Sequence, residues 1–299
     1  MDPRPTEQRH PEADGLHLRP AAEIGALFVQ AQGDAVNSLS AAIPAIETAA
    51  QAAAAALRQG GRLGYAGAGS SGLMALADAL ELAGTFGIPP ERTPILFAGG
   101  ASALLHMRGD VEDDTAAATQ DFRRSGLYRG DVLIAVSASG GTPYALAVAD
   151  ADAARAGGVT VVGIANVAPS PLLERADIAI HLATPPELVS GSTRLGAATA
   201  QKAALNLMSV LLGIELGHVH DGFMVNVQAD NAKLVGRAAR IVAGVAGVND
   251  AAAKAALAQT GGAVKSAILV AQGRTPEDAE QALRQSGGHL APLLAAPDQ

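Results

Sequence analysis

The sequence predicts an α/β fold in which a five-stranded parallel sheet is flanked by helices, with helices before the sheet and a small helical domain after it. Five short β-prone runs alternate with helix-length, Ala-rich segments between residues 62 and 182, the pattern of a parallel sheet. Apolar residues at helical spacing precede these runs, and only helical patterns follow Leu182. With 299 residues, 49% of them hydrophobic, the chain can form one large core or two modest ones.

The elements follow from the N-terminus. Residues 1–19 form a polar, Pro-containing tail, and helices are predicted at 21–32 and 34–59, the second ended by Gly60-Gly61. The β-prone runs are 62–66, 94–98, 131–137, 159–164 and 177–182. A polar loop then leads to helices at 197–217, 227–245, 250–259, 263–272 and 276–285. We expect three segments, namely an N-terminal tail with helices (1–59), a sheet domain (60–235) and a C-terminal helical domain (236–299).

The composition disfavours several classes of function. The net charge of −8 and the scattered Lys and Arg residues give no basic face for nucleic acid. The absence of cysteine excludes disulfides, thiolate chemistry and Cys-type metal sites. The polar N-terminus lacks a secretory pattern, and no apolar run reaches about 18 residues. We therefore expect no membrane association and a cytoplasmic location.

The stretch GYAGAGSSG places Gly67, Gly69 and Gly72 in G-x-G-x-x-G spacing between a β-prone run and a helix. Dinucleotide-binding turns share this spacing, but they need an acidic residue at the end of the next strand, about 20 residues on. Here the next strand runs into Ala98-Gly99-Gly100. The sequence therefore disfavours a nicotinamide or flavin site.

A second β-prone run, in VLIAVSASGGTPY, is followed by Ser137, Ser139 and Thr142 just before a helix. Hydroxyls and exposed backbone amides at a helix N-terminus suit one phosphate group. The two turns follow parallel strands, so both face the crevice where such sheets bind ligands. The alternative is that Ser and Gly only cap helices, although capping does not require several hydroxyls in one turn.

The paired motifs GAGSSG and SASGGTPY resemble those of the sugar isomerase (SIS) domain, which handles phosphosugars. Within that domain the chain most resembles the N-acetylmuramic acid 6-phosphate etherase family. The resemblance runs nearly end to end, through TEQRHP (6–11), Asp78 and Glu81 with TFG (85–87), AGG (98–100), VEDD (111–114), PELVSGSTR (186–194), AQK (200–202) and MVNVQADNAKL (224–234). It implies a SIS-type five-stranded sheet, a helical, UBA-like C-terminal appendage and a homodimer.

The resemblance also implies the reaction. The family removes a D-lactyl group from carbon 3 of a 2-acetamido sugar 6-phosphate by elimination followed by addition of water. An acid and a base suffice for this chemistry, so no metal or redox cofactor is expected. Matched position by position, Glu81 is the general acid and Glu112 the general base.

Each carboxylate has a structural alternative. Glu81 could be a solvated helix residue, although its neighbours Leu80, Leu82 and Ala83 suggest a desolvated carboxyl with a raised pKa. Glu112 begins a Glu-Asp-Asp run that also suits a helix N-terminus, so a purely structural role stays open.

Hydroxyl-bearing turns are expected to bind the sugar phosphate. The phosphate is assigned to the second turn and the sugar hydroxyls to the first, while the PELVSGST loop closes over the ligand. The residues are Ser137, Ser139, Gly140 and Thr142 for the phosphate, Gly69, Ser70 and Ser71 for the sugar, and Glu187, Ser192 and Thr193 for the loop. Arg194 is expected to bind an anionic group such as the lactyl carboxylate, or to form an interdomain salt bridge.

The histidines carry less information. His218 and His220 form an H-x-H pair without a third ligand at useful spacing, so no metal site is predicted. His106, near the loop that carries Glu112, is assigned no role.

The match departs from the family at four places. Family members usually carry an Arg after the first Gly-rich turn, Ser-Glu-Cys-Pro-Pro around the acid, Met-Lys after the GSTR loop and Cys-Asn-Pro after the fourth strand. Here these positions read Leu73, Leu80-Glu81-Leu82-Ala83-Gly84, Leu195-Gly196 and Asn166-Val167-Ala168. Two basic groups are thus missing near a site that must bind two anions, and this leaves the lactyl side of the substrate in question.

Three hypotheses follow. The first is an etherase acting on N-acetylmuramic acid 6-phosphate. The second is the same elimination on another 3-O-substituted sugar phosphate. The third is a non-catalytic sugar-phosphate sensor, like the glucokinase regulatory protein, which the presence of both Glu81 and Glu112 disfavours.

Overall fold

The computed structural model describes residues 4–150, 157–227 and 232–294. The chain divides into two compact units, of which the first comprises residues 1–80 and 90–209 and the second residues 81–89 and 210–299. The first unit contains the sheet, and the second is mostly helical.

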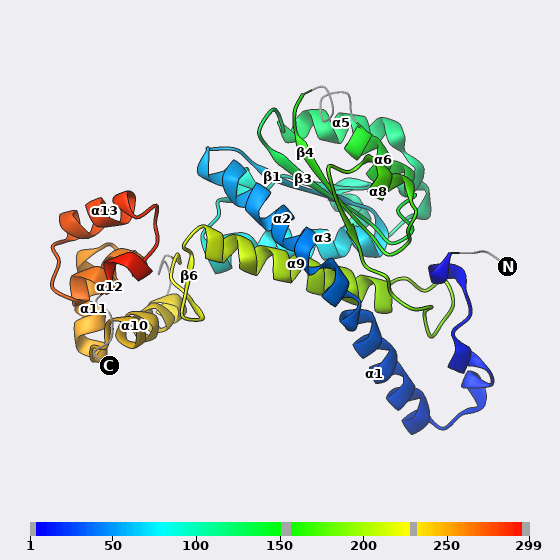
Figure 1. Cartoon of the computed structure of the whole chain (residues 1–299), viewed down its shortest axis with the longest axis horizontal. Coiled ribbons are helices and arrows are strands. Elements are labelled where there is room, and N and C mark those ends of the chain that lie inside the picture. The colour runs from blue at the N-terminus through cyan, green and yellow to red at the C-terminus, as the bar shows by residue number, and fades with distance from the viewer. Residues whose placement is uncertain (1–3, 151–156, 228–231, 295–299) are drawn as a thin grey trace. The chain divides into compact units, whose positions relative to one another are not determined.

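The sheet of the first unit has five parallel strands in the order β2-β1-β3-β4-β5 (Figure 1). The strands are β1 (Leu63–Gly67), β2 (Ile95–Phe97), β3 (Val132–Ser137), β4 (Thr160–Ala165) and β5 (Ile178–His181). Each coincides with a predicted run to within two residues at either end. Strands β1 and β3 are buried along their whole length, as expected for parallel strands covered on both faces.

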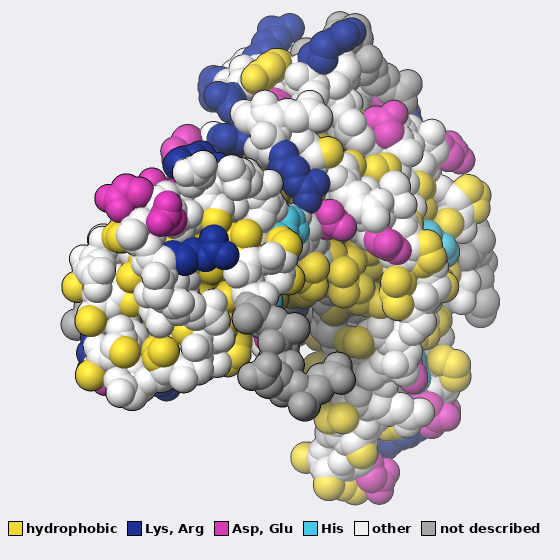
Figure 2. All heavy atoms as spheres, turned by 60° about the vertical axis from the view of Figure 1, so that its left-hand side comes forward, with side chains coloured by type: hydrophobic (Ala, Val, Ile, Leu, Met, Phe, Trp, Pro, Cys, Tyr) yellow, Lys and Arg dark blue, Asp and Glu magenta, His cyan; other side chains and the backbone are white. Residues whose placement is uncertain are grey.

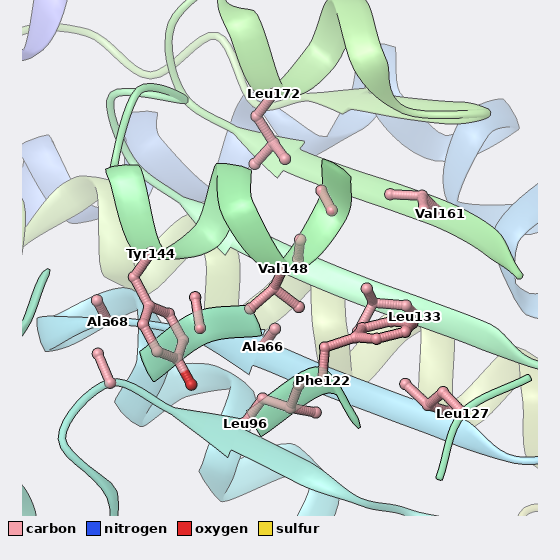
Figure 3. Close-up of a cluster of buried hydrophobic side chains, with 14 of the residues drawn as sticks. Ala66, Ala68, Leu96, Phe122, Leu127, Leu133, Tyr144, Val148, Val161 and Leu172 are labelled. Carbon is pink, nitrogen blue, oxygen red and sulfur yellow. The ribbon is translucent and has the colours of Figure 1, made fainter. Parts of the chain in front are cut away.

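Helices cover both faces of the sheet (Figure 1). They are α2 (Leu39–Arg58), α3 (Gly69–Phe86), α4 (Gly100–Leu105), α5 (Thr115–Ser125), α6 (Pro143–Asp150), α8 (Pro171–Arg175) and α9 (Gly196–Glu215). Helix α1 (Ala21–Asn37) contacts α2 and extends away from the sheet (Figure 1). Figure 3 shows the core beneath α5, α6 and α8, where Phe122, Tyr144 and Leu172 pack against strand residues such as Leu133 and Val161. This core fixes the strand ends from which the site loops emerge.

The second unit contains α10 (Ala232–Ala246), α11 (Asp250–Gln259), α12 (Val264–Ala271) and α13 (Pro276–Gln285), which share one hydrophobic core. Two helices begin with side-chain caps, because Asn249 and Thr275 accept hydrogen bonds from the amides of Ala252 and Asp278. The four helices were predicted. The predicted start of the first, at Val227, is wrong because Val227 precedes the helix, and residues 228–231 lie outside the described residues.

One short sheet was not predicted. Strands β6 (Val219–His220) and β7 (Phe223–Met224) form an antiparallel pair, so the expectation that no strand follows Leu182 is wrong. The pair turns through Asp221 and Gly222, whose φ angles are 44° and 76°. Positive φ at both central residues is typical of a tight hairpin turn with the Asp-Gly sequence, but two-residue strands are too short to show an alternating pattern.

The compact units group the segments differently from the expected division at residues 59 and 235, which stays a prediction. Helix α2 contacts strands β1, β3 and β5, so the N-terminal helices belong to the same unit as the sheet. The boundaries between the two compact units fall within helices, after Leu80 in α3 and after Ser209 in α9.

Candidate functional site

The first Gly-rich turn joins β1 to α3 through close backbone packing. A Cβ atom on Gly67 would lie 2.8 Å from the α-carbon of Gly72, and one on Gly72 would lie 2.8 Å from backbone atoms of Gly67. Gly69 has a φ of +54° and begins α3. The three glycines are therefore required by backbone approach and conformation, and the turn does not depend on a dinucleotide.

The second turn gathers three hydroxyls between β3 and α6. Ser137 Oγ lies 2.8 Å from Thr142 Oγ1 and 3.5 Å from Ser139 Oγ. The amide of Gly140 donates to Ser137 Oγ at 3.1 Å, and the amide of Gly141 donates to Ser139 Oγ at 3.1 Å. Two of the hydroxyls thus shape the turn, and all three are held together just before the first residue of α6, Pro143.

The two turns emerge side by side from the sheet. Strand β1 pairs with both β2 and β3, and Gly67 stands level with Phe97 and Val136. The turns after β1 and β3 therefore begin at the same edge of the sheet, as the sequence predicts for a shared crevice.

Glu112 lies directly beside the first turn. It belongs to a short 3₁₀ helix, Gly109–Asp113, and a Cβ atom on Gly69 would lie only 2.5 Å from its Oε1. Both residues line a cavity of about 80 Å³, together with Phe97, Arg108 and Val111 among others. Burial, and secondly the charge of Asp113, raise the pKa of the Glu112 carboxyl, which suits a proton acceptor.

The structural alternative for Glu112 is answered by a neighbouring residue. Helix α5 begins after Asp114, whose Oδ1 accepts a hydrogen bond from the amide of Ala117 at 2.8 Å. Asp114 therefore caps the helix. The Glu112 carboxylate is turned toward Gly69 instead.

Glu81 lies on α3, in the second compact unit, and is exposed in the chain. The expectation that its apolar neighbours desolvate it is wrong, because consecutive residues of a helix face directions about 100° apart. Leu82 is buried and Leu80 is 63% exposed. The chain by itself does not enclose the Glu81 carboxyl, and its role as an acid stays a prediction.

Glu187, predicted to close over the ligand, holds the start of helix α9. Its Oε2 accepts a hydrogen bond from the amide of Gly196 and its Oε1 one from the amide of Ala197, both at 2.8 Å. The side chain is buried, with 4% of its surface exposed. The same loop is fastened to the N-terminal segment, because Ser190 Oγ donates to the carbonyl of Glu7.

The remaining predicted ligands lie at the start of α3 and in the loop before α9. Ser70 is half-buried and Ser71 is buried at the start of α3, Ser192 and Thr193 are half-buried, and Arg194 is exposed. No described contact distinguishes the two roles considered for Arg194, and substrate binding by these residues stays a prediction.

Buried polar groups that were assigned no role from the sequence support the site loops. Gln201 Nε2 donates to Asn166 Oδ1 at 2.8 Å, and the amide of Asn166 donates to the carbonyl of Ala138, in the second turn. Asn166 Nδ2 donates to Thr184 Oγ1, in the segment before Glu187. Asn166 thus holds the second turn through its backbone amide and the segment before Glu187 through its side-chain amide.

Asp78, one turn before Glu81 on α3, anchors that helix. Its carboxylate is 4% exposed and accepts hydrogen bonds from Tyr65, Asn206 and Ser209 at 2.8–3.0 Å. Burial raises the pKa of Asp78, and the hydrogen bonds oppose that change. The network ties α3 to β1 and α9.

The described residues contain no group of three or more His, Asp or Glu side chains placed to hold a metal ion. His106 is exposed and does not line the cavity. His218 is partly buried, and burial lowers its pKa to about 4. His220 lies 3.7 Å from Asp221.

The surface mixes charged and apolar groups. Figure 2 shows Lys and Arg side chains interspersed with Asp, Glu and hydrophobic ones on the face drawn. Among the described helices, α9 has the length and hydropathy of a membrane span, but 56% of its apolar window is buried in the protein. Helices α10 and α11 reach the length and hydropathy of a membrane span only when taken together, and they are bent by 109° relative to each other. Such helices also occur in protein cores.

Comparison with known proteins agrees with these features. Residues 30–166 match the SIS domain family. The chain is 46% identical to an N-acetylmuramic acid 6-phosphate etherase of Deinococcus radiodurans, over 98% of this chain and 96% of the relative. It is 40% identical to the Streptomyces avermitilis protein of the same name, over 97% and 93%.

A solved structure shares the fold. It is a protein from Bacteroides fragilis assigned as a phosphosugar isomerase involved in capsule formation, with a TM-score of 0.50 and 20% identity, covering 64% of this chain and 90% of that one. The SIS-type fold is therefore confirmed. Because relatives at 40–46% identity match almost the full length, the chain belongs to the N-acetylmuramic acid 6-phosphate etherase family.

Proposed function

We propose that the protein cleaves the D-lactyl ether of N-acetylmuramic acid 6-phosphate, releasing N-acetylglucosamine 6-phosphate and D-lactate. The full-length relatives carry the name of this activity. The observation that supports it most directly is the Glu112 carboxylate, which lines a cavity against the first Gly-rich turn and has a raised pKa. A carboxylate in that setting can act as a general base near neutral pH.

The phosphate is assigned to the second turn. Ser137, Ser139 and Thr142 present their hydroxyls at the N-terminal end of α6, where hydroxyls and the helix dipole favour a dianion. The sugar ring or chain then extends toward the neighbouring turn at Gly69 and the Glu112 cavity. Ser70 and Ser71 are assigned to its hydroxyls.

The chemistry begins with the open-chain aldehyde, in which the proton on carbon 2 is acidified by the carbonyl group. Glu112 takes this proton, and the electron pair forms an enolate. The pair then forms a double bond between carbons 2 and 3, the bond from carbon 3 to the lactyl oxygen breaks, and an acid protonates that oxygen. Water adds to carbon 3, and carbon 2 regains a proton. The net change is hydrolysis, with no oxidation or reduction.

We assign Glu81 as the general acid, and we propose that the active form of the enzyme is a homodimer. Glu81 is exposed in the single chain, next to Leu80 with 63% of its surface exposed. A carboxyl that donates a proton near neutral pH needs burial or a nearby charge to raise its pKa. Coverage of this part of α3 by a second subunit would provide the burial. We place the reaction in the cytoplasm, in the recycling of peptidoglycan sugars.

A second candidate is the same elimination on another 3-O-substituted sugar phosphate. Leu73 and Gly196 stand at two positions where the family resemblance implies basic residues, which changes the groups available to an anionic substituent. A non-catalytic sugar-phosphate sensor is the third, but a sensor needs no base such as the half-buried Glu112 carboxylate.

Incubation with N-acetylmuramic acid 6-phosphate in deuterated water separates the three. Release of D-lactate with deuterium at carbon 2 of the product supports the proposal. Binding without turnover would instead support the sensor. If the compound neither binds nor reacts, the substrate is a different sugar phosphate.

A further inference from the structure

The cavity beside Glu112 is lined by an arginine, Arg108, that was assigned no role from the sequence. Arg108 lines it together with Gly69 and Glu112. Among the lining residues, Arg108 is the only basic one and Glu112 the only acidic one. Arg108 comes four residues before Glu112 on the same loop, so the positions of the two side chains are set by one stretch of backbone.

Arg108 is held by a neighbouring carboxylate. Its Nε donates to Asp110 Oδ1 at 3.0 Å, and its Nη2 donates to Asp110 Oδ2. This two-point contact is the geometry in which a guanidinium recognises any carboxylate. Arg108, which lines the cavity, can therefore bind a carboxylate through two hydrogen bonds.

The ion pair can be exchanged at little cost. The side chains of Arg108 and Asp110 are 68% and 62% exposed, and exposed pairs contribute little to stability. An incoming carboxylate that forms the same two hydrogen bonds can thus replace Asp110, which remains solvated.

The position of the cavity indicates which anionic group of the substrate it receives. In the proposed reaction Glu112 acts at carbon 2, and the lactyl group is attached to the adjacent carbon 3. The phosphate, on carbon 6, is assigned to the hydroxyl cluster on the far side of β1, after β3. A cation in the cavity of the base is thus placed for the lactyl carboxylate, and the phosphate lies elsewhere.

We propose that Arg108 binds the lactyl carboxylate of the substrate by exchanging Asp110 for it. This inference rests on the proposed function. It supplies a positive charge in a cavity whose other lining residues carry none. Arg108 is accordingly a residue that determines specificity for a 3-O-substituent bearing a carboxylate.

The test compares two ligands that differ only in the lactyl group. For the wild type, Arg108→Ala and Asp110→Ala, the KM for N-acetylmuramic acid 6-phosphate and the inhibition constant of N-acetylglucosamine 6-phosphate are measured. Arg108→Ala is expected to raise the KM about tenfold or more, the scale of losing a charged hydrogen-bond pair, and to leave the inhibition constant within about twofold. Asp110→Ala removes the competing carboxylate and is expected to lower the KM.

Arg124→Ala is the matched control, because Arg124 is an exposed arginine on α5 that also pairs with a nearby aspartate, Asp121. It is expected to change neither constant. Equal weakening of both ligands by Arg108→Ala would place Arg108 at the phosphate and overturn the inference. An unchanged KM would overturn it as well.

Turnover by the wild type shows whether the proposed function fails, independently of the role of Arg108. If the wild type does not turn over N-acetylmuramic acid 6-phosphate, calorimetric titration of the same two ligands tests Arg108 through binding alone. A selective loss of the lactyl-bearing ligand in Arg108→Ala then supports the inference. Binding of neither ligand by the wild type overturns it together with the proposed function.

Discussion

The carboxylate of Glu112 lies against the α-carbon of Gly69, so that a single added methyl group at Gly69 would come within 2.5 Å of Glu112 Oε1. The glycine has a left-handed backbone, with a φ of +54°. The first Gly-rich turn therefore serves two purposes, since it opens helix α3 and leaves room for the carboxylate that we propose as the base.

Gly69→Ala is expected to lower kcat/KM about 10²-fold, because the methyl group displaces Glu112 and misplacement of a reacting group by about 1 Å has effects of this size. The left-handed conformation adds a stability cost of about 1–2 kcal/mol. Steady-state kinetics and urea unfolding measure the two effects. The control is Gly236→Ala on α10, where no heavy atom lies within 4 Å of the added Cβ. If Gly69→Ala retains wild-type activity, Glu112 does not act from this position.

Asp113→Asn is expected to move the acidic limb of the kcat/KM profile to lower pH. Burial of Glu112, and secondly the negative charge of Asp113, raise the pKa of Glu112. A base is active only when deprotonated, so activity rises with pH through this pKa. Removal of the Asp113 charge lowers the pKa and extends activity toward acid. A limb that stays in place, or moves to higher pH, would show that another group controls it.

Glu187→Ala is expected to lower the free energy of unfolding by about 2 kcal/mol or more, because two amides at the start of α9 lose a charged acceptor. Urea unfolding followed by circular dichroism measures this. Ser192→Ala, in the same loop, is the comparison. If Glu187→Ala instead raises the KM at unchanged stability, the carboxylate binds ligand and its capping role is secondary.

His218 is expected to make the second unit sensitive to acid. Burial, and secondly the nearby charge of Lys265, lower its pKa from 6.5 to about 4, and its Nδ1 has no hydrogen-bond partner among the described residues. Between about pH 6.5 and pH 4, His218 therefore binds a proton in the unfolded chain but stays neutral in the folded chain. The free energy of unfolding falls as the pH drops through this range. The loss is about 2 kcal/mol after allowance for partial exposure.

Thermal unfolding of the wild type and of His218→Gln across this pH range measures the effect. The glutamine does not titrate, so the difference between the two curves isolates His218. Parallel curves would mean that His218 titrates normally in the folded protein.

The fold could be predicted because its signals are local. Apolar runs such as Val132–Ser137 mark buried parallel strands, and Gly60-Gly61 ends α2 within two residues of the expected position. The β6–β7 hairpin was missed because each strand has two residues. Its one sequence signal was Asp221-Gly222, the dipeptide of a tight hairpin turn.

The site was less predictable because its side chains depend on contacts distant in sequence. Glu112 and Asp114 are equivalent as helix-start residues in sequence, and only the fold shows that Asp114 caps α5 while Glu112 faces Gly69. Glu187 and Gly196 come together across a loop. Arg108 had a signal, since it precedes Glu112 by four residues, but nothing in the sequence indicates that it lines the same cavity.

If Glu112 removes the proton from carbon 2, it also catalyses exchange of that proton with the solvent. N-acetylglucosamine 6-phosphate is incubated in deuterated water with the wild type, Glu112→Gln and Glu81→Gln, and loss of the carbon 2 proton signal is followed by NMR. We predict that Glu112→Gln exchanges at least about 10²-fold more slowly than the wild type, whereas Glu81→Gln continues to exchange. Exchange by Glu112→Gln at the wild-type rate would contradict the account.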